Sequence, residues 1–158
     1  MRAHLMAAVI STALTVTSAS ATVVISDDAG GKMKDYATHF QQVRDSGEPV
    51  VIAGKCVSAC TMVLGFVPRD RICATPGAVL GFHAAWTFDD SGKRVVSATG
   101  TQDLMKTYPA SVRAWIARRG GLTPKMMYLR GSDLAAIVAP CDRSRMASVS
   151  RSKRSGAT

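Results

Sequence analysis

The sequence predicts an α/β fold built as a single domain, and three observations support this prediction. Short apolar, β-branched runs alternate with segments of helical periodicity, the order found in parallel sheets with right-handed crossover connections. The run at residues 49–53 is apolar without interruption, as in strands buried on both faces. Residues 22–142 have the size of one ordinary domain and contain no internal repeat.

The first half of this domain is expected to contain four strands and two helices. Met33, Tyr36 and Phe40 recur at helical spacing within residues 32–46, and Gly47 is suited to end that helix. A second helix is expected over residues 58–67, directly after a strand and a turn. The strands are expected at residues 22–25, 49–53, 71–74 and 79–82.

The second half is expected to be mainly helical. Residues 89–93 form a polar, hairpin-like or lid-like excursion. Apolar residues from Leu104 to Ile116 mark two helical segments, with Pro109 at the start of the second. Thr123 and Pro124 predict a helix that runs to Leu129, and Ser132 predicts a cap for a last short helix into Ala136.

Residues 1–21 have the three parts of a cleavable secretory signal peptide. Arg2 and His4 form a short basic region, residues 5–16 are apolar, and Ala19-Ser20-Ala21 supplies the small residues before the cut. The apolar part is too short to span a bilayer, and no other run is long enough for an integral membrane span. We therefore expect a periplasmic or secreted protein.

Residues 143–158 are rich in Ser and Arg and almost free of large apolar side chains, which predicts a disordered basic tail. This tail contributes to the net charge of +9. Basic tails contact anionic lipids or nucleic acids, but a solvated tail without a specific partner is the simpler interpretation. Export argues further against nucleic acid as a partner.

The mature part contains four cysteines, Cys56, Cys60, Cys73 and Cys141. An even number in an exported protein favours two disulfides, and the sequence leaves all three pairings open. A zinc site made from three of these cysteines and a histidine is the rival interpretation. It is disfavoured because the spacing lacks the paired two-residue knuckles of structural zinc sites.

Three features together suggest nucleophilic catalysis. Ser58 follows a buried strand and begins a helix, so that its hydroxyl and the next amide, of Ala59, face the same site. His83 ends a later apolar strand, and Gly30-Gly31 ends the first one. Each has a simpler interpretation: Ser58 as a helix cap, His83 as a structural histidine and Gly30-Gly31 as a turn. The hypothesis depends on their combination and order.

That combination resembles the ClpP/crotonase superfamily and, within it, the exported (periplasmic) ClpP-like proteins of bacteria. The resemblance covers about 60 residues well and the later helices only loosely. The segments that carry it are VVISDDAGG (23–31), VVIAG (50–54), CVSACTMVLG (56–65), RIC (71–73) and GFHAA (81–85).

The resemblance implies a fold of ββα crossover units and possible serine hydrolase chemistry. Ser58 would be the nucleophile, His83 the general base, and Gly31 and Ala59 the oxyanion-hole donors. The family completes its triad with an aspartate before the final helix, but the matching stretch here, residues 120–128, contains no carboxylate. Asp133 is the candidate that remains nearby. Asp103 and Asp142 are weaker candidates.

Two functions therefore fit the sequence. The first is an exported ClpP-like serine hydrolase, peptidase-like, that acts on an unknown peptide or acyl substrate. The second is a catalytically silent, disulfide-stabilised envelope protein with a binding or structural role. Neither requires a cofactor or a metal. ATP-driven proteolysis is not expected because the envelope lacks ATP, whereas assembly into a homo-oligomer is suggested by the resemblance alone.

Overall fold

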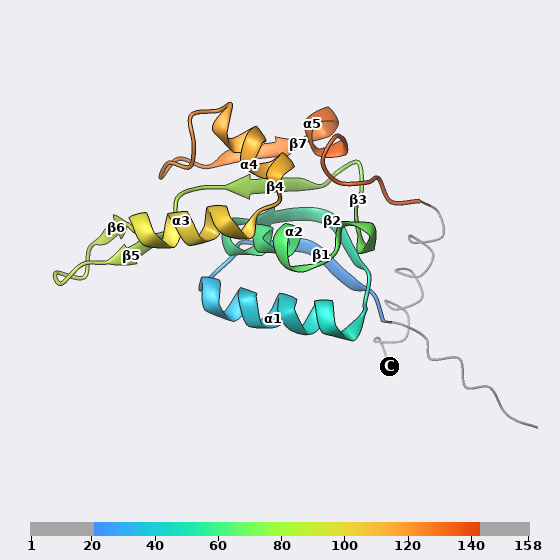
Figure 1. Ribbon diagram of the computed structural model, residues 1–158, viewed down its shortest axis with the longest axis horizontal. Coiled ribbons are helices and arrows are strands. Elements are labelled where there is room, and N and C mark those ends of the chain that lie inside the picture. Colours follow the sequence, from blue (N-terminus) through green and yellow to red (C-terminus); the bar gives the residue numbers. More distant parts are fainter. Residues whose placement is uncertain (1–20, 143–158) are drawn as a thin grey trace, which may run out of the picture.

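A five-stranded mixed sheet lies at the centre of the molecule (Figure 1). The computed structural model describes residues 21–142. The predicted tail, and the predicted signal peptide apart from Ala21, lie outside the described residues. The fold is thus a single mixed α/β domain. Its sheet comprises β1 (Val23–Asp28), β2 (Val50–Val57), β3 (Ile72–Ala74), β4 (Val79–Phe82) and β7 (Met127–Arg130).

Strand β2 is the centre of the sheet and is longer than predicted. Its first half pairs in parallel with β3 and its second half, Lys55 to Val57, pairs in parallel with β4. Strand β1 pairs in parallel with β2 from Val50 to Cys56, with a register shift between Ile25 and Asp27. Pairing with β1 and β4 explains why residues 54–57 continue the strand instead of forming the predicted turn.

The helix predicted at residues 124–129 is wrong. The structure has strand β7 there, antiparallel to β4, with Leu129 opposite Leu80. The Thr-Pro pair suggested a helix start, but tertiary pairing with an otherwise open edge of the sheet overrides that local signal. Leu129 is fully buried and its neighbours Tyr128 and Arg130 are exposed, which is the alternation of a strand with one covered face.

The helices cover one face of the sheet. Side chains of β2 alternate, so that Val50, Ile52 and Cys56 join the hydrophobic core beneath the helices, while Val51 is buried outside that cluster. The helical elements are α1 (Met33–Ser46), the 3-10 helix η1 (Ser58–Met62), α2 (Val63–Phe66), the 3-10 helix η2 (Arg69–Arg71), α3 (Ala98–Thr107), α4 (Ala110–Ala117) and α5 (Gly131–Ala135).

Aromatic side chains join the later helices to the sheet. The ring of Phe82, at the end of β4, lies 5.3 Å from that of Tyr108 and 5.7 Å from that of Trp115. All three residues are almost fully buried. Aromatic pairs at these separations add to the stabilisation that burial provides. This cluster fixes the end of β4, and therefore the residue that follows it.

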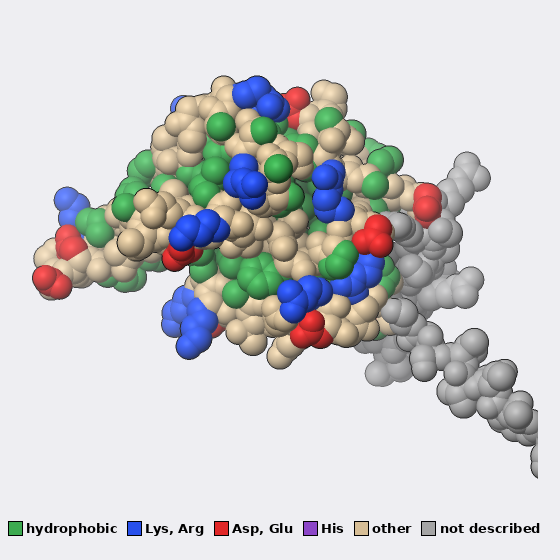
Figure 2. All heavy atoms as spheres, in the orientation of Figure 1, with side chains coloured by type: hydrophobic (Ala, Val, Ile, Leu, Met, Phe, Trp, Pro, Cys, Tyr) green, Lys and Arg blue, Asp and Glu red, His purple; other side chains and the backbone are tan. Residues whose placement is uncertain are grey.

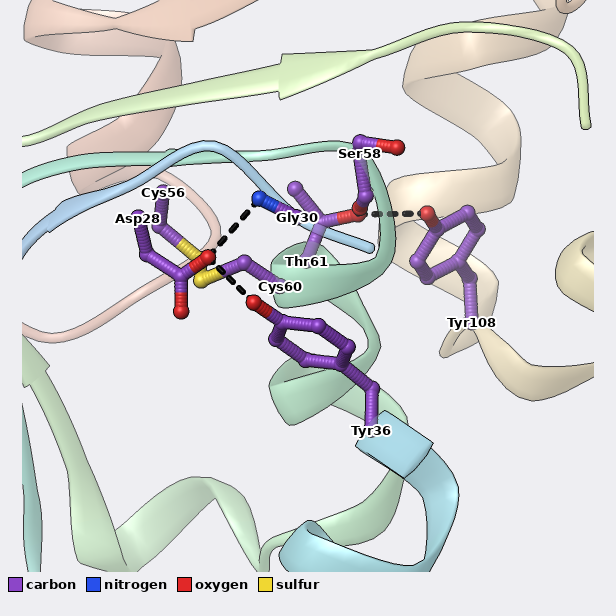
Figure 3. Close-up of a disulfide and its surroundings, with 8 residues drawn as sticks. All are labelled: Asp28, Gly30, Tyr36, Cys56, Ser58, Cys60, Thr61 and Tyr108. Carbon is purple, nitrogen blue, oxygen red and sulfur yellow. Dashed lines mark hydrogen bonds between the residues drawn. A yellow bond between two sulfur atoms is a disulfide. The ribbon is translucent and has the colours of Figure 1, made fainter. Parts of the chain in front are cut away.

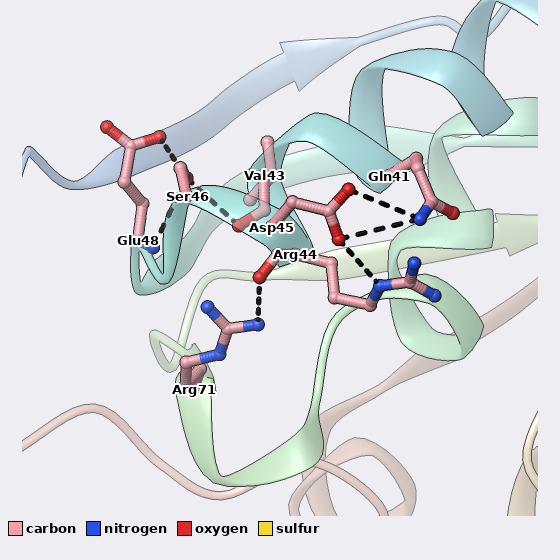
Figure 4. A network of polar contacts seen from close by, with 7 residues as sticks. All are labelled: Gln41, Val43, Arg44, Asp45, Ser46, Glu48 and Arg71. Atoms are coloured by element: carbon pink, nitrogen blue, oxygen red, sulfur yellow. Dashed lines mark hydrogen bonds and ion pairs between the residues drawn. The ribbon is translucent and has the colours of Figure 1, made fainter.

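The C-terminal end of α1 is joined to η2 by a polar network (Figure 4). Gly47 ends the helix in the left-handed conformation, with φ of 78°, as predicted. The Arg71 guanidinium donates to the backbone carbonyl of Arg44 at 2.9 Å, and Arg44 also forms an ion pair with Asp45. The Arg44 carbonyl also accepts from the Gly47 amide at 3.3 Å, and a cation in the last turn interacts favourably with the helix dipole.

A two-stranded hairpin projects from the domain. Strands β5 (Trp86–Phe88) and β6 (Arg94–Val96) pair only with each other, in an antiparallel sheet. In Figure 1 the hairpin lies at the left, whereas the two ends of the described chain lie at the right. Asp89 organises its turn, because its carboxylate accepts hydrogen bonds from Ser91 and from the Lys93 amide. The predicted excursion at residues 89–93 is therefore the tip of a hairpin.

Charged side chains are distributed over the surface. On the face shown in Figure 2, Lys and Arg side chains are spread over the domain, with Asp and Glu side chains near several of them. No helix within residues 21–142 is long and apolar enough to cross a membrane.

Candidate functional site

Three neighbouring parallel strands end at one edge of the sheet and carry the predicted site. β1 leads into Gly30 and Gly31, β2 into Ser58, and β4 into His83. Because β1 and β4 both pair in parallel with β2, the carboxyl ends of all three strands lie together. This is the edge at which open α/β sheets place their ligands.

Ser58 occupies a tight turn between β2 and η1. Its φ is +59°, and it is the one non-glycine residue among those described with a positive φ. Such a conformation is unfavourable for a residue with a Cβ and persists only where surrounding contacts enforce it. It presents the side chain away from the strand and helix that flank it, as a nucleophile at a strand-to-helix turn requires.

Gly30 is one of those enforcing contacts. A Cβ added at Gly30 would lie 2.5 Å from the Ser58 Cβ and 2.9 Å from the Ala59 nitrogen. Its φ of +77° is also in the region that favours glycine. The backbone of the first turn therefore packs directly against the Ser58 turn, and only glycine allows this approach.

Ser58 and His83 are in contact. The His83 Nε2 lies 2.8 Å from the Ser58 Oγ, at the centre of the hydrogen-bonding range. The second ring nitrogen, Nδ1, lies 2.7 Å from the backbone carbonyl of Ala84. A carbonyl can only accept, so Nδ1 donates to it, and in the neutral ring Nε2 is then the acceptor of the serine hydroxyl. This is the tautomer that a general base needs.

Asp133 does not serve as the orienting acid at this pair. Its carboxylate accepts hydrogen bonds from the Trp115 indole at 3.2 Å and from the Arg119 guanidinium at 2.6 Å. It therefore joins α5 to α4, because its place at the start of α5 directs it toward Arg119. The Ala84 carbonyl takes the position beside His83 for which a carboxylate was expected. Asp103 also lies elsewhere, paired with Lys106 on α3.

The Ala84 carbonyl is held in place by the hydrogen bonds of the chain around it. The Ala84 amide donates to the Thr123 carbonyl at 2.8 Å, and the Ala85 amide donates to the Thr101 hydroxyl at 3.0 Å. Ala84 itself is buried. These bonds define the peptide planes on both sides of the residue and so the direction in which its carbonyl points.

The Gly30–Gly31 turn is organised by Asp28, which the sequence did not single out. Figure 3 shows the Asp28 carboxylate between two donors, the Gly30 amide at 2.8 Å and the Tyr36 hydroxyl at 2.5 Å. The Gly30 amide is thus committed to Asp28, whereas Gly31 lines the cavity beside Ser58. The Gly30 amide is therefore not free to bind an oxyanion, and the role of Gly31 as an oxyanion donor stays a prediction. An Asp two residues before a glycine is a signal for such a turn.

The Asp28 contact also alters Tyr36. Burial, together with the hydrogen bond and the charge of Asp28, raises the pKa of Tyr36 from 10.0 to about 12. Tyr36 lies in the first helical turn of α1, the helix that follows the Gly30–Gly31 turn, and packs against the core. The neutral hydroxyl is therefore the form that joins α1 to this turn.

A second buried hydrogen-bond chain holds the Ser58 turn from the opposite side. The Thr61 hydroxyl donates to the Ser58 carbonyl at 2.6 Å and lies 2.6 Å from the Tyr108 hydroxyl (Figure 3). Since Thr61 has one proton and the carbonyl can only accept, Tyr108 must be the donor to Thr61. Burial raises the pKa of Tyr108 well above its usual value, which keeps this donor protonated. Thr61 and Tyr108 are 47 positions apart in the sequence, so sequence patterns do not predict this contact.

The four cysteines form two disulfides, Cys56–Cys60 and Cys73–Cys141. The first encloses the Ser58 turn, because Cys56 is in β2 and Cys60 is in η1 (Figure 3). The second joins β3 to the end of the described chain. None of the four is a free thiol, and residues 21–142 contain no group of His, Cys, Asp or Glu suited to hold a metal.

Two cavities meet at the Ser58–His83 pair. One, of about 470 Å³, is mainly apolar; Met33, Ala59, Phe88 and Leu104 line it among others, and Lys32 is the charged residue in its lining. The other, of about 540 Å³, is bordered by Gly30, Arg94, Pro124 and Met126 among others. Both are also lined by Gly31, Ser58, His83 and Trp86. The pair therefore lies in the middle of a two-sided groove, one wall of which is the β5–β6 hairpin.

Comparisons with known proteins give no family for this chain. No protein-family model matches the sequence, and a search of curated proteins finds no significant match.

Proposed function

We propose that this chain is an exported, ClpP-like serine hydrolase, peptidase-like in its chemistry, that uses Ser58 and His83. The observation that carries the proposal is the 2.8 Å contact between Ser58 Oγ and His83 Nε2, in a groove that Gly31 and Ala59 also line. A nucleophile within hydrogen-bond reach of its base, beside candidate oxyanion donors, is the arrangement that acyl transfer requires.

The reaction begins when His83 takes the Ser58 proton on Nε2 as Oγ attacks the acyl carbon. The amides of Gly31 and Ala59 stabilise the oxyanion, and His83 then delivers the proton to the leaving group. Water, deprotonated by the same imidazole, cleaves the acyl-serine ester and restores Ser58. In total, the bond between the acyl carbon and the leaving group is broken. The acyl carbon gains the hydroxyl group of the water molecule, and the leaving group gains a proton.

The Ala84 carbonyl takes the orienting role of the third residue in this mechanism. It fixes the tautomer of His83 as an aspartate would, but it offers a dipole instead of a full negative charge. The imidazolium formed during the reaction is therefore less stabilised than in a complete triad. We expect a slow hydrolase with a competent nucleophile.

Export and the ClpP/crotonase-like fold belong to the same proposal. Two disulfides in one small domain favour an oxidising compartment, as does the signal-peptide pattern of residues 1–21. The parallel β1–β2–β4 order, with Gly-Gly, Ser and His at successive strand ends, supports the fold assignment.

A fluorophosphonate probe tests the nucleophile directly. The oxidised mature protein is incubated with the probe, and the labelled residue is located by mass spectrometry. Wild-type protein is expected to be labelled at Ser58, with no labelling of Ser58→Ala and at least tenfold slower labelling of His83→Ala. Ser132→Ala and His39→Ala, which change an exposed serine on α5 and an exposed histidine on α1, are matched controls.

The second candidate function is a catalytically silent binding protein. It is favoured by one observation, that neither ring nitrogen of His83 contacts a carboxylate. Well-folded, oxidised protein that is not labelled at Ser58 would establish this alternative and rule out the hydrolase. Labelling that persists at the wild-type rate in Ser58→Ala would show that Ser58 is not the nucleophile.

A further inference from the structure

Arg94 is placed in the groove without a carboxylate partner. It lines the cavity of about 540 Å³ together with Gly30, Ser58 and His83, and it is the one Lys, Arg, Asp or Glu among the residues that line that cavity. The ion pairs found among residues 21–142 involve other cations, namely Arg44, Lys55, Lys106 and Arg119.

The Arg94 guanidinium is exposed and stacks on an aromatic ring of the same hairpin. Its central carbon lies 3.9 Å from the centre of the Trp86 ring, a cation–π contact. Trp86 pairs with Val96 and Phe88 pairs with Arg94, so this contact is diagonal across the two strands. A guanidinium stacked on a ring keeps its N–H groups in its own plane, where they can bind a carboxylate in bidentate fashion.

The hairpin tip carries two acidic residues, Asp89 and Asp90, and neither forms an ion pair with Arg94 among the described residues. Asp89 accepts through one oxygen from the amides of Ser91 and Lys93 and from the Ser91 hydroxyl. These bonds lower the pKa of Asp89, and they hold its carboxylate in the turn. The ligand of Arg94 is therefore expected to come from outside the hairpin.

The linings of the two cavities indicate which half of a substrate reaches Arg94. Gly31 and Ala59 both line the apolar cavity, whereas Ala59 is not part of the lining of the Arg94 cavity. The mainly apolar lining of the first cavity suits an apolar acyl group, whose carbonyl oxygen points at these two amides. The leaving group then extends on the other side of Ser58, toward Arg94.

We infer that the substrate is an N-acyl amino acid or short peptide with an apolar acyl half, whose leaving half ends in a free carboxylate that binds Arg94. This inference rests on the proposed function for its direction and adds a specificity residue that the chemistry itself does not require. Hydrolysis breaks the amide bond next to the last residue, water supplies the hydroxyl and the proton, and an amino acid is released.

The test is a binding experiment on the full mature domain carrying Ser58→Ala, so that it does not depend on turnover. N-acetyl-phenylalanyl-alanine and its C-terminal amide are titrated separately by calorimetry. The acid is expected to bind at least tenfold more tightly than the amide, and high salt is expected to weaken the acid alone. Equal affinities, or no binding of either compound at millimolar concentration, would overturn the inference.

Variants then identify the residue that causes the preference for the acid over the amide. Arg94→Gln is expected to remove the difference between acid and amide, and Arg94→Lys to restore part of it. Lys93→Gln is the matched control, because it removes the neighbouring positive charge. The hydrogen bond to Asp89 comes from the backbone amide of Lys93, so this substitution leaves it in place. A difference that survives Arg94→Gln contradicts the assignment. A failure of the proposed hydrolase function would give a different result: wild-type protein would not be labelled by the fluorophosphonate probe, but the acid would still bind.

Discussion

The two walls of the Ser58–His83 groove are built very differently. One wall consists of the ends of β1, β2 and β4, where a close backbone approach, two buried hydrogen-bond networks and a disulfide act on a few residues. The other is the β5–β6 hairpin, whose strands pair only with each other and whose Trp86 and Phe88 are 41% and 60% exposed.

This difference separates the groups that need a fixed geometry from those that meet a ligand. The proposed nucleophile, base and oxyanion donors would have to be positioned before the reaction, and these residues lie on the buried wall. The hairpin has few buried contacts and thus belongs to the part of the fold that opens most easily. The predictions below test this contrast, from the largest effect to the smallest.

Gly30→Ala should strongly reduce the reactivity of Ser58, whereas the same substitution at Gly92 in the hairpin should not. The new methyl group would meet Ser58 and Ala59 at distances that no structure tolerates, so the Ser58 turn must move. We expect fluorophosphonate labelling to slow by about two orders of magnitude, since small displacements of reacting groups have effects of this size.

Gly92→Ala is the control for this prediction. Gly92 has nearly the same φ, 78°, but nothing lies within 4 Å of an added Cβ. It should lose about 1 kcal/mol of stability, the cost of a left-handed alanine, and keep the wild-type labelling rate. Equal labelling of both variants would show that the approach of Gly30 to Ser58 is unimportant.

The two disulfides should contribute to different properties. Cys73–Cys141 closes a segment with a sequence separation of 68, and its loss should lower the free energy of unfolding by about 4 kcal/mol. Cys56–Cys60, with a separation of 4, should contribute about 2 kcal/mol, yet its loss should slow labelling of Ser58 more. Double Cys→Ser variants are compared by urea denaturation and by labelling rate. The reverse pattern in labelling would contradict the role of Cys56–Cys60 at the turn.

Thr61→Val should weaken the buried wall from within. It leaves the Tyr108 hydroxyl without its acceptor and the Ser58 carbonyl without its donor, and an unsatisfied buried group costs about 1–3 kcal/mol. Thermal denaturation and labelling rate should both show the change. Thr38→Val, at an exposed position of α1, should change neither by a comparable amount.

Tyr36→Phe should have the smallest effect and one that depends on pH. The pKa of Tyr36 is raised to about 12 in the folded state, so between pH 10 and 12 the unfolded chain loses this proton first. The stabilisation is complete below pH 10 and declines as pH rises toward 12. Wild-type stability, measured by urea denaturation, should therefore fall more steeply in this window than that of Tyr36→Phe. Parallel curves would show that the contact with Asp28 is absent in solution.

The sequence predicted the buried part of the fold better than its edges. The strands from Val23 to Phe82 and the helix α1 follow from apolar periodicity, which burial enforces. β7 was predicted as a helix because a Thr-Pro start is a local signal, while its pairing with β4 is tertiary.

The candidate site was predicted in the same uneven way. Ser58, His83 and the Gly30–Gly31 turn were found because each follows a recognisable strand. The sequence favours Asp133 as the acid because a carboxylate can be recognised in a sequence, whereas a particular role of a backbone carbonyl cannot. Whether these residues catalyse a reaction stays a prediction, and so do the roles of residues 1–20 and 143–158.

The carbonyl of Ala84 has a consequence for the genetics of this protein. Every amino acid supplies the same carbonyl, so no missense mutation at position 84 deletes the group that orients His83. Mutations there act through the volume of a side chain that is 2% exposed. In the proposed mechanism, an alanine scan would therefore identify the side chains of Ser58 and His83 and miss the third partner. Only a change to the backbone, for example an ester bond between residues 84 and 85 that makes this carbonyl a weaker acceptor, would reveal it.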